Sequence, residues 1–329
     1  MKIAFAGLRH AHIFVLHKMA VENPLFEVTG AFEADPAARA EAVAKGVDCR
    51  YESYDELLAD PAVEAVALGG CFGDRGGMAI RALLAGKHVI ADKPLCTSLV
   101  ELDAIEALAE VCGLTVSCMF TMRFEKKIRA VKALVESGAL GQIRNVYFGG
   151  QHPLQYGRRP MWYFEDGKHG GTINDIAIHG IDVLEYACGL SVDKILAARC
   201  WNGYAEAQPA FKDCAQLMLT ATNGAGILAD VSYAIPDGVE FGLPYYWEFC
   251  LWGSKGTLRF SLHEKESRYY LAGRKEPVLL EEPPVETDYL TDLHSMIAGG
   301  HSALPMEAVF RATRKTLEIQ QFADTIRLA

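Results

Sequence analysis

The sequence predicts an α/β protein in which a doubly wound parallel sheet is followed by a second domain built on a mostly antiparallel sheet. Up to about residue 121, short apolar runs alternate with segments of helical periodicity, a pattern typical of parallel sheets covered by helices. Beyond it, strand-like segments follow one another, separated by turn sequences such as Thr222-Asn223-Gly224, which indicates hairpins. The length of 329 residues exceeds what one hydrophobic core usually holds. We therefore expect two domains, over residues 1–121 and 122–329.

In the first domain, each expected strand is a short apolar run, and each expected helix repeats apolar residues at helical spacing. Ile13, Leu16 and Met19 show this spacing in the first helix. Ser53 stands where a side chain would cap the N-terminus of a short helix. The expected strands are 2–7, 26–32, 63–68, 87–91 and 115–119, and the expected helices are 11–22, 36–45, 54–59, 75–85 and 98–112.

In the second domain, strands dominate. The first helix of this domain is expected to end at Gly138, and the acidic, proline-bearing stretch 276–286 is expected to be a surface loop. The expected helices are 123–136, 172–187, 288–298 and 306–327, and the expected strands are 142–150, 192–202, 212–222, 225–235, 245–252, 256–262 and 267–272.

The composition excludes several classes of partner. The net charge of −10 and the absence of a basic stripe argue against a nucleic-acid partner. No apolar run is long enough to span a bilayer, and the chain enters its first strand without a charged-then-apolar leader.

Nine scattered cysteines form no C-x-x-C pair, which fits a reducing, cytoplasmic setting and excludes a zinc knuckle. Because His152, His169 and His179 lack tight ligand spacing, we predict no metal site.

The N-terminus carries a strand, a turn beginning at Gly7 and a helix, the arrangement that cradles the pyrophosphate of a dinucleotide. The full fingerprint is G-x-G-x-x-G, and here Arg9 and His12 stand in the places of its second and third glycines. Two interpretations remain open: either Arg9 binds a phosphate through its guanidinium, or the turn has closed and binds no dinucleotide. Glu33, at the end of the second strand, is either a solvated acid or the acceptor for adenosine ribose hydroxyls. In the second role it favours NAD over NADP, because it would repel a 2′-phosphate.

Asp175 and His179 interrupt an otherwise apolar helical segment. They are four residues apart, so they are expected to share one face of the helix, and Asp182 continues the same stripe. Carboxylate and imidazole groups on a mostly buried helix are costly unless they are paired or used. These residues alone support two hypotheses equally. In the first, they form a structural pair or a polar face that meets solvent. In the second, they form a proton-handling site.

Lys93 follows the expected strand 87–91, and ligands of open α/β sheets bind outside that edge. Pro94 restricts the backbone of Lys93 to extended conformations. The spacing alone favours an ordinary surface lysine. The alternative is a side chain that reaches into the cleft and hydrogen-bonds a substrate hydroxyl or carbonyl.

Four ordered segments resemble one known protein family. Residues 85–95, with Ala-Gly-Lys-His-Val followed by Asp-Lys-Pro-Leu, are similar to the A-G-K-H-V…E-K-P-L block of the Gfo/Idh/MocA oxidoreductases, with Asp92 for the usual glutamate. Residues 170–182 resemble the family's G-G-x-x-x-D-x-x-x-H-x-x-D block. Residues 137–143 and 253–258 resemble two further family segments, so the resemblance extends across the whole chain.

The resemblance implies a Rossmann domain followed by an α/β domain whose open, mostly antiparallel sheet often forms oligomer contacts, as in a homodimer or homotetramer. It also implies hydride exchange between NAD(P) and a hydroxyl-bearing carbon of a sugar, cyclitol or related polyol. By motif, Lys93 binds or polarises the reacting oxygen, Asp175 orients the substrate and His179 transfers the proton. Histidine suits that last role because its pKa lies near working pH.

The same resemblance implies two sets of binding residues. The turn and the strand ends of the first domain are expected to meet the cofactor, and the loop before the helix 172–187 is expected to approach the substrate. The competing interpretations are a polar loop around His10 and His12, and a solvated loop anchored by Trp162. The expected cofactor-binding residues are Gly7, Arg9, His10, His12, Glu33, Cys71, Phe72, Arg75 and Asp92, and the expected substrate-binding residues are Lys93, His152, Arg158, Trp162, Tyr163 and Asp175.

Two departures from the family pattern support an alternative function. Arg9 and His12 replace glycines, and residues 70–75 (Gly-Cys-Phe-Gly-Asp-Arg) stand where the family often has T-P-N-x-x-H beside the nicotinamide. The alternative is a non-redox descendant with altered or lost cofactor binding. It would act as a sensor of a sugar-like ligand, or as a lyase or isomerase that uses the same lysine, aspartate and histidine.

Overall fold

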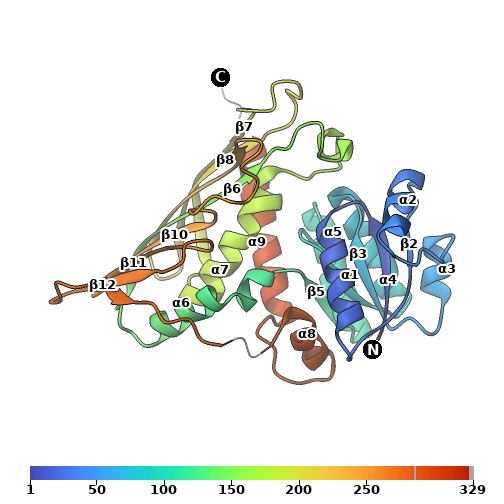
Figure 1. The fold of residues 1–329 in the computed structure, drawn as a ribbon, viewed down its shortest axis with the longest axis horizontal. Coiled ribbons are helices and arrows are strands. Elements are labelled where there is room, and N and C mark those ends of the chain that lie inside the picture. Colours follow the sequence, from blue (N-terminus) through green and yellow to red (C-terminus); the bar gives the residue numbers. More distant parts are fainter. Residues whose placement is uncertain (285–286, 326–329) are drawn as a thin grey trace. The chain divides into compact units, whose positions relative to one another are not determined.

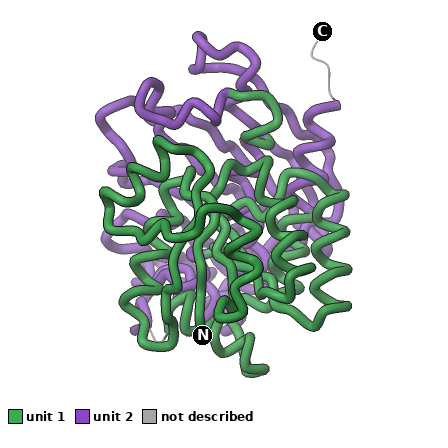
Figure 2. The backbone as a smooth tube through the Cα atoms, turned by 90° about the vertical axis from the view of Figure 1, so that its right-hand side faces the viewer, with its two compact units in different colours: residues 1–120, 165–170, 287–314 green, residues 121–164, 171–286, 315–329 purple. Residues whose placement is uncertain are grey.

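The computed structural model describes residues 1–284 and 287–325, which form two compact units (Figure 2). The first unit consists of residues 1–120, 165–170 and 287–314, and the second holds the other described residues. Both units are therefore discontinuous in sequence. The predicted division at residue 121 remains a prediction about which segments fold as domains.

The first unit is built on a five-stranded parallel sheet with the order β2-β1-β3-β4-β5, as predicted. Its central strands are buried along almost their whole length, because helices cover both faces of such a sheet. In the sheet, β2 lies on one side of β1, and β3 lies on the other side. A topological switch point therefore lies between the carboxyl ends of β1 and β3. The strands are β1 (Lys2–Leu8), β2 (Glu27–Phe32), β3 (Ala65–Gly69), β4 (His88–Ala91) and β5 (Val116–Cys118).

The helices of this unit begin and end close to the predicted positions, with one exception. Ser53 caps its helix as predicted, accepting the Glu56 N–H at 3.0 Å. One helix begins at Phe72 rather than at residue 75. Glycines in its first turn hide its helical pattern, but Gly73 is required there because a Cβ would meet the Gly167 carbonyl oxygen at 1.9 Å. The helices are α1 (His12–Glu22), α2 (Pro36–Ala44), α3 (Tyr54–Ala59), α4 (Phe72–Leu84) and α5 (Leu99–Cys112).

The late segment 287–314 packs against the end of this sheet. It contains α8 (Tyr289–Ile297) and the first part of α9 (Met306–Thr325), and α9 continues into the second unit. The hydroxyls of Ser117 and Tyr289 lie 2.9 Å apart, which ties α8 to β5. The last two residues of the predicted helix 306–327 lie outside the described residues. None of the helices in the described ranges combines the length and apolarity needed to cross a membrane.

The second unit is built on an eight-stranded sheet with the order β13-β12-β11-β10-β6-β9-β8-β7 (Figure 1). As predicted, it is mostly antiparallel, although β6 and β9 pair in parallel. The strand β13 was not predicted, because two residues at a sheet edge give no detectable alternation within the expected loop 276–286. The strands are β6 (Ile143–Pro153), β7 (Val192–Trp201), β8 (Cys214–Ala221), β9 (Gly226–Ile235), β10 (Glu248–Gly253), β11 (Gly256–Ser261), β12 (Arg268–Leu271) and β13 (Val278–Leu279).

Two helices, α6 (Lys126–Glu136) and α7 (Ile178–Cys188), lie along one face of this sheet (Figure 1). Gly180 allows close contact between α7 and β6, because a Cβ there would meet the Phe148 ring at 2.3 Å. The helix predicted over 172–187 is not uniform. Its first turn, η3 (Ile173–Ala177), is a π-helix that continues directly into α7. Such turns occur often at functional sites.

Candidate functional site

The turn after β1 has room only for glycine at its first position. Gly7 has φ +73°, and a Cβ there would lie 2.6 Å from the Gly70 nitrogen in the turn that follows β3. The N–H groups of Arg9 and His10 both donate to the Gly69 carbonyl, at 3.1 and 3.0 Å. The two turns at the topological switch point are therefore held against each other by backbone contacts.

Glu33 lies at the end of β2 and is 4% exposed. One carboxylate oxygen accepts the Asp35 N–H at 2.8 Å, and the other accepts the Leu8 N–H. Each oxygen keeps a second lone pair that could accept a ribose hydroxyl. Glu33 therefore holds the ends of β1 and β2 together and is a buried acid rather than a solvated one. Arg9 lies close by and forms an ion pair with Asp35 at 3.5 Å.

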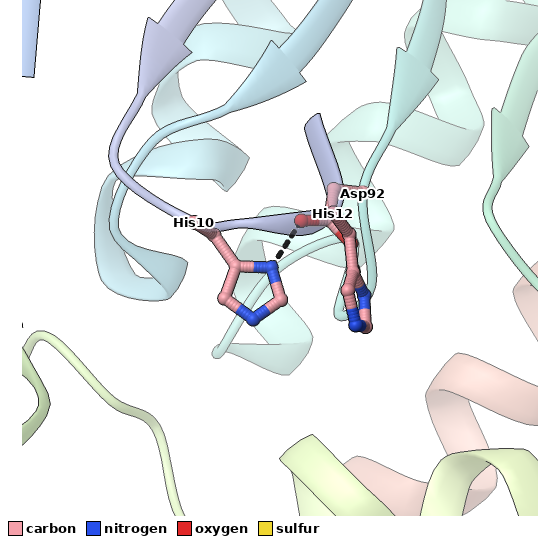
Figure 3. Close-up of side chains that lie close together, drawn as sticks. All are labelled: His10, His12 and Asp92. Atoms are coloured by element: carbon pink, nitrogen blue, oxygen red, sulfur yellow. Dashed lines mark hydrogen bonds and ion pairs between the residues drawn. The ribbon is translucent and has the colours of Figure 1, made fainter. Parts of the chain in front are cut away.

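The side chains of His10, His12 and Asp92 lie together at the carboxyl ends of β1 and β4 (Figure 3). His10 Nδ1 contacts Asp92 Oδ2, while His12 Nδ1 lies 3.4 Å from Asp92 Oδ1. Burial lowers the pKa of His10 to about 3, although Asp92 opposes this shift, so the imidazole is neutral near neutral pH. Burial by itself raises the pKa of Asp92, but the groups around it, including Arg75, hold that pKa well below its usual range.

Arg75 has no exposed surface and links the turn after β3 to the end of β4. Its guanidinium donates to the carbonyl oxygens of Gly70, Asp92 and Lys93 at 2.9, 2.7 and 2.5 Å. It also lies 3.2 Å from Asp92 Oδ2. Arg75 could therefore act on a cofactor through Asp92 and the backbone, rather than by direct contact.

Cys71, Phe72 and Lys93 lie near this bridge and are almost fully buried. Lys93 is thus not the exposed surface lysine that spacing alone favoured, and its Nζ lies 5.7 Å from the centre of the Phe72 ring. Burial raises the pKa of the Cys71 thiol to about 11, so this group stays protonated at neutral pH.

In the second unit, Asp175 and His179 are both buried, at 2% and 8% exposure. Asp175 lies in the π-helical turn η3 and accepts a hydrogen bond from the Tyr233 hydroxyl of β9. Burial and the charge of Asp175 hold the pKa of Tyr233 well above its usual value, so the phenol remains a donor. The His179 ring lies 5.8 Å, centre to centre, from that of Trp247.

Aromatic rings connect these two residues to His152 of β6. The His152 ring lies 5.9 Å from Trp247 and 6.3 Å from Tyr233, and its Nε2 lies 3.4 Å from the Tyr246 hydroxyl. Trp247 is buried and has φ +52°, a conformation that a bulky residue rarely adopts and that is often found at functional sites. We call the following set the polar–aromatic cluster: His152, Arg159, Tyr163, Asp175, His179, Tyr233, Tyr246 and Trp247.

The two neighbouring arginines before α7 have different surroundings. Arg158 is exposed and forms an ion pair with Glu240. The guanidinium of Arg159 lies over the rings of Tyr163 and Tyr233, at 4.5 and 5.0 Å from their centres. Trp162 and Tyr163 are both buried, which agrees with an anchored loop.

Nothing in the sequence indicated Tyr233 and Trp247 as site residues, and of the two loop arginines, sequence reasoning selected Arg158 rather than Arg159. Tyr233 is 58 residues from Asp175, and no spacing rule connects the two. The missing information is the pairing of β9 with β6, which brings Tyr233 beside the start of α7. Arg159 could not be distinguished from Arg158 without its contacts to the rings of Tyr163 and Tyr233.

Family models match most of the chain. Residues 1–120 match the model described as the oxidoreductase family, NAD-binding Rossmann fold. Residues 128–259 match the GFO/IDH/MocA C-terminal domain. The chain belongs to the Gfo/Idh/MocA oxidoreductase family. The Gfo/Idh/MocA membership implied by the four sequence segments is thereby confirmed.

Individual Gfo/Idh/MocA proteins are similar to this chain at low identity. It is 27% identical to myo-inositol 2-dehydrogenase of Thermotoga maritima, a match covering 46% of this chain and 44% of that protein. It is 29% identical to scyllo-inositol 2-dehydrogenase (NAD(+)) of Bacillus subtilis, covering 48% of this chain and 45% of that one. The chain thus matches less than half the length of either relative. Its fold is similar to that of an inositol dehydrogenase homolog from Azotobacter vinelandii, complexed with NAD⁺. The TM-score is 0.82 at 19% identity, and the match covers 100% of this chain and 96% of that one.

The residues of this Gfo/Idh/MocA protein fit a dinucleotide at the Rossmann switch point. Gly7 provides the close approach between turns that a Cβ would block. Arg9 and the half-exposed His12, at the start of α1, could meet a pyrophosphate, and Glu33 could meet a ribose. The turn is therefore built around its single glycine and two basic side chains.

Proposed function

We propose that this protein is an NAD-dependent oxidoreductase that transfers hydride to or from a hydroxyl-bearing carbon of a sugar, cyclitol or related polyol. The observation that carries the proposal is the polar–aromatic cluster, in which Asp175 and His179 are buried beside aromatic rings. Buried imidazole and carboxylate groups suit proton transfer, and aromatic rings suit sugar-like substrates. Relatives named as inositol dehydrogenases support the same substrate class.

NAD, when bound, would supply the hydride acceptor or donor at its nicotinamide. Gly7, Arg9 and His12 would hold the pyrophosphate, and Glu33 would accept the ribose hydroxyls. The buried carboxylate of Glu33 supports NAD over NADP, because a 2′-phosphate would meet a negative charge. His10, Cys71, Phe72, Arg75 and Asp92 would shape the nicotinamide end.

Three residues would carry the proton chemistry. His179 would take the proton of the substrate hydroxyl as hydride leaves its carbon, and return it in the reverse direction. Asp175, fixed by Tyr233, would orient the substrate, and Lys93 would polarise the reacting oxygen. The loop residues His152, Arg158, Trp162 and Tyr163 would contribute to the substrate side, with the half-buried Arg159 beside them.

A titration with NADH tests the cofactor, and substitution of His179 tests the chemistry. We expect saturable binding of NADH by fluorescence or calorimetry, and NAD-dependent turnover with a member of a panel of sugars and cyclitols. His179→Ala should keep NADH binding and lose about 10²- to 10⁴-fold in kcat. The matched control is His301→Ala, an exposed histidine that should change neither quantity.

The possible results separate the parts of this proposal. No NADH binding at millimolar concentration would reject the cofactor assignment. Full turnover by His179→Ala, with binding intact, would reject only the proton-transfer role.

A non-redox descendant is the second candidate, and the replacement of two fingerprint glycines by Arg9 and His12 favours it. Such a protein would sense a sugar-like ligand, or act as a lyase or isomerase through Lys93, Asp175 and His179. It would convert or bind its ligand equally well with and without added NAD. Strict dependence of turnover on NAD would reject this candidate.

We further propose a cytoplasmic homo-oligomer. All nine cysteines are free thiols, which supports a reducing compartment. The second-unit sheet exposes apolar side chains on the face away from α6 and α7, which supports a homodimer or homotetramer formed through it. We call this set the outward sheet face: Leu196, Met218, Leu228, Trp252 and Tyr270, each about half exposed.

A further inference from the structure

The cluster of His10, His12 and Asp92 has the chemistry of a metal site. Each residue offers one nitrogen or oxygen ligand atom, and these atoms lie within 4.8 Å of one another (Figure 3). We propose that the cluster binds one divalent transition-metal ion through two imidazoles and one carboxylate. This inference goes beyond the proposed hydride transfer and does not depend on it. With a metal bound, His12 would be a metal ligand, and Arg9 would be the side chain left to meet the pyrophosphate.

The parallel sheet explains why the sequence alone predicted no metal site. His10 and His12 are two residues apart just beyond β1, whereas Asp92 follows β4, 82 residues after His10. Both strands pair with β3, so their carboxyl ends reach the same edge of the sheet. The third ligand therefore comes from a distant segment that no local spacing reveals.

Asp92 has one oxygen suited to a metal. Its Oδ2 contacts Arg75 and His10, while its Oδ1 is buried and forms no hydrogen bond with any part of the chain that the structure describes. An unsatisfied buried carboxylate oxygen is costly, and a metal ion would satisfy it. His12 lies beside this same oxygen, at 3.4 Å.

Arg75 would serve as the outer partner that fixes the carboxylate. Carboxylates that bind metals are usually held by hydrogen bonds of this kind. Arg75 is itself held by backbone carbonyl groups, so its orientation does not depend on a bound ion.

The ligand set and the geometry both suit a metal of the zinc or cobalt class. Two imidazole nitrogens and one carboxylate oxygen are ligands that such metals accept. Ligand atoms around a tetrahedral Zn²⁺ lie about 3.3 Å apart, so the cluster must contract slightly. The His12 side chain is 47% exposed and can move to achieve this. The two imidazole ligands favour Zn²⁺ or Co²⁺ over Mg²⁺, which prefers oxygen ligands.

Cobalt binding by tag-free full-length protein tests the proposal. After chelator treatment and dialysis, the protein is titrated with Co²⁺ and followed by visible absorption, and Zn²⁺ is then added as competitor. We expect one equivalent of Co²⁺ with the absorption of nitrogen and oxygen coordination, displaced by one equivalent of Zn²⁺. His12→Ala removes a half-exposed side chain. It should weaken Co²⁺ binding by more than the roughly 10- to 100-fold that follows when a metal ligand loses its outer partner.

His301→Ala is the control, because it removes an exposed histidine outside the cluster. Circular dichroism checks that each variant is folded. Binding that is absent from the wild type, exceeds one equivalent without saturating, or is equal in wild type and His12→Ala would overturn the proposal.

Discussion

Asp175 and Asp182 lie in the same motif, yet the structure gives their carboxylates different kinds of partner. Asp175 accepts a hydrogen bond from a neutral phenol, that of Tyr233. Asp182 accepts three from Arg123, with N···O distances of 3.0, 3.0 and 2.6 Å. A carboxylate already paired with a fixed charge has little capacity left for a ligand, so Asp182 is a structural residue and Asp175 the better candidate for substrate contact.

The Arg123–Asp182 pair leads to a stability prediction. Both side chains are almost fully buried, so Asp182→Ala should remove the carboxylate that pairs with the Arg123 guanidinium and lower the free energy of unfolding by about 3–5 kcal/mol. The double variant Arg123→Met, Asp182→Leu should recover most of that loss, because it removes both charges. Urea unfolding followed by tryptophan fluorescence measures both changes. A single variant that costs less than about 1 kcal/mol would show that Arg123 does not depend on this partner.

At the scale of elements, β4 carries a pH-sensitive contact. His88, its first residue, accepts the Thr115 N–H at 2.9 Å through Nδ1. Burial lowers the pKa of His88 below its usual 6.5, with Glu64 opposing the shift. Below pH 6.5 the unfolded chain therefore binds a proton that the folded chain does not, so acid disfavours the fold. Above pH 6.5 this term has no effect.

Between pH 6.5 and the lower pKa of folded His88, the free energy of unfolding should fall less steeply with decreasing pH in His88→Gln than in the wild type. Urea unfolding at several pH values measures the slope, and His301→Gln, at an exposed site, is the control. Equal slopes in wild type and His88→Gln would show that β4 does not contribute to the pH dependence.

The elements also show what the sequence can and cannot predict. The strands β1 to β5 were placed within about two residues. For the central strands β1 and β3 the reason is that a strand buried on both faces is an uninterrupted apolar run. The first turn of α4 was missed because its glycines are selected by close packing rather than by helix propensity. The π-helical turn η3 was missed because residues 173–184 are all buried, so the segment has no exposed face whose periodicity an extra residue would shift.

The same limits apply to the candidate sites. The resemblance to family motifs pointed to Lys93, Asp175 and His179. Spacing alone favoured a surface lysine at Lys93 and did not decide the role of the other two. Tyr233 and Arg159 gave no such signal, because their contacts depend on strand pairing and on loop burial.

At the scale of the whole molecule, the outward sheet face predicts association between copies of this chain. Residues opposite one another in register, such as Met218 and Leu228, place apolar side chains side by side on it. Leu228→Lys should shift the protein toward the mass of a single chain, as measured by light scattering after gel filtration. Val111→Lys is the control, because Val111 is 84% exposed on α5, which is not part of that sheet. A monomeric wild type, or an unchanged mass for Leu228→Lys, would reject this interface.

The division of the first unit into distant segments has a consequence for synthesis on the ribosome. Its five strands are complete once residue 118 has emerged, but α8, which bonds to β5 through Tyr289, comes from the last part of the chain. Domains usually fold as units in the order in which they are made. Here the first sheet lacks its contact with α8 while every strand of the second sheet, β6 to β13, is translated. A chaperone that shields the nascent chain during that interval would therefore protect the β5 edge.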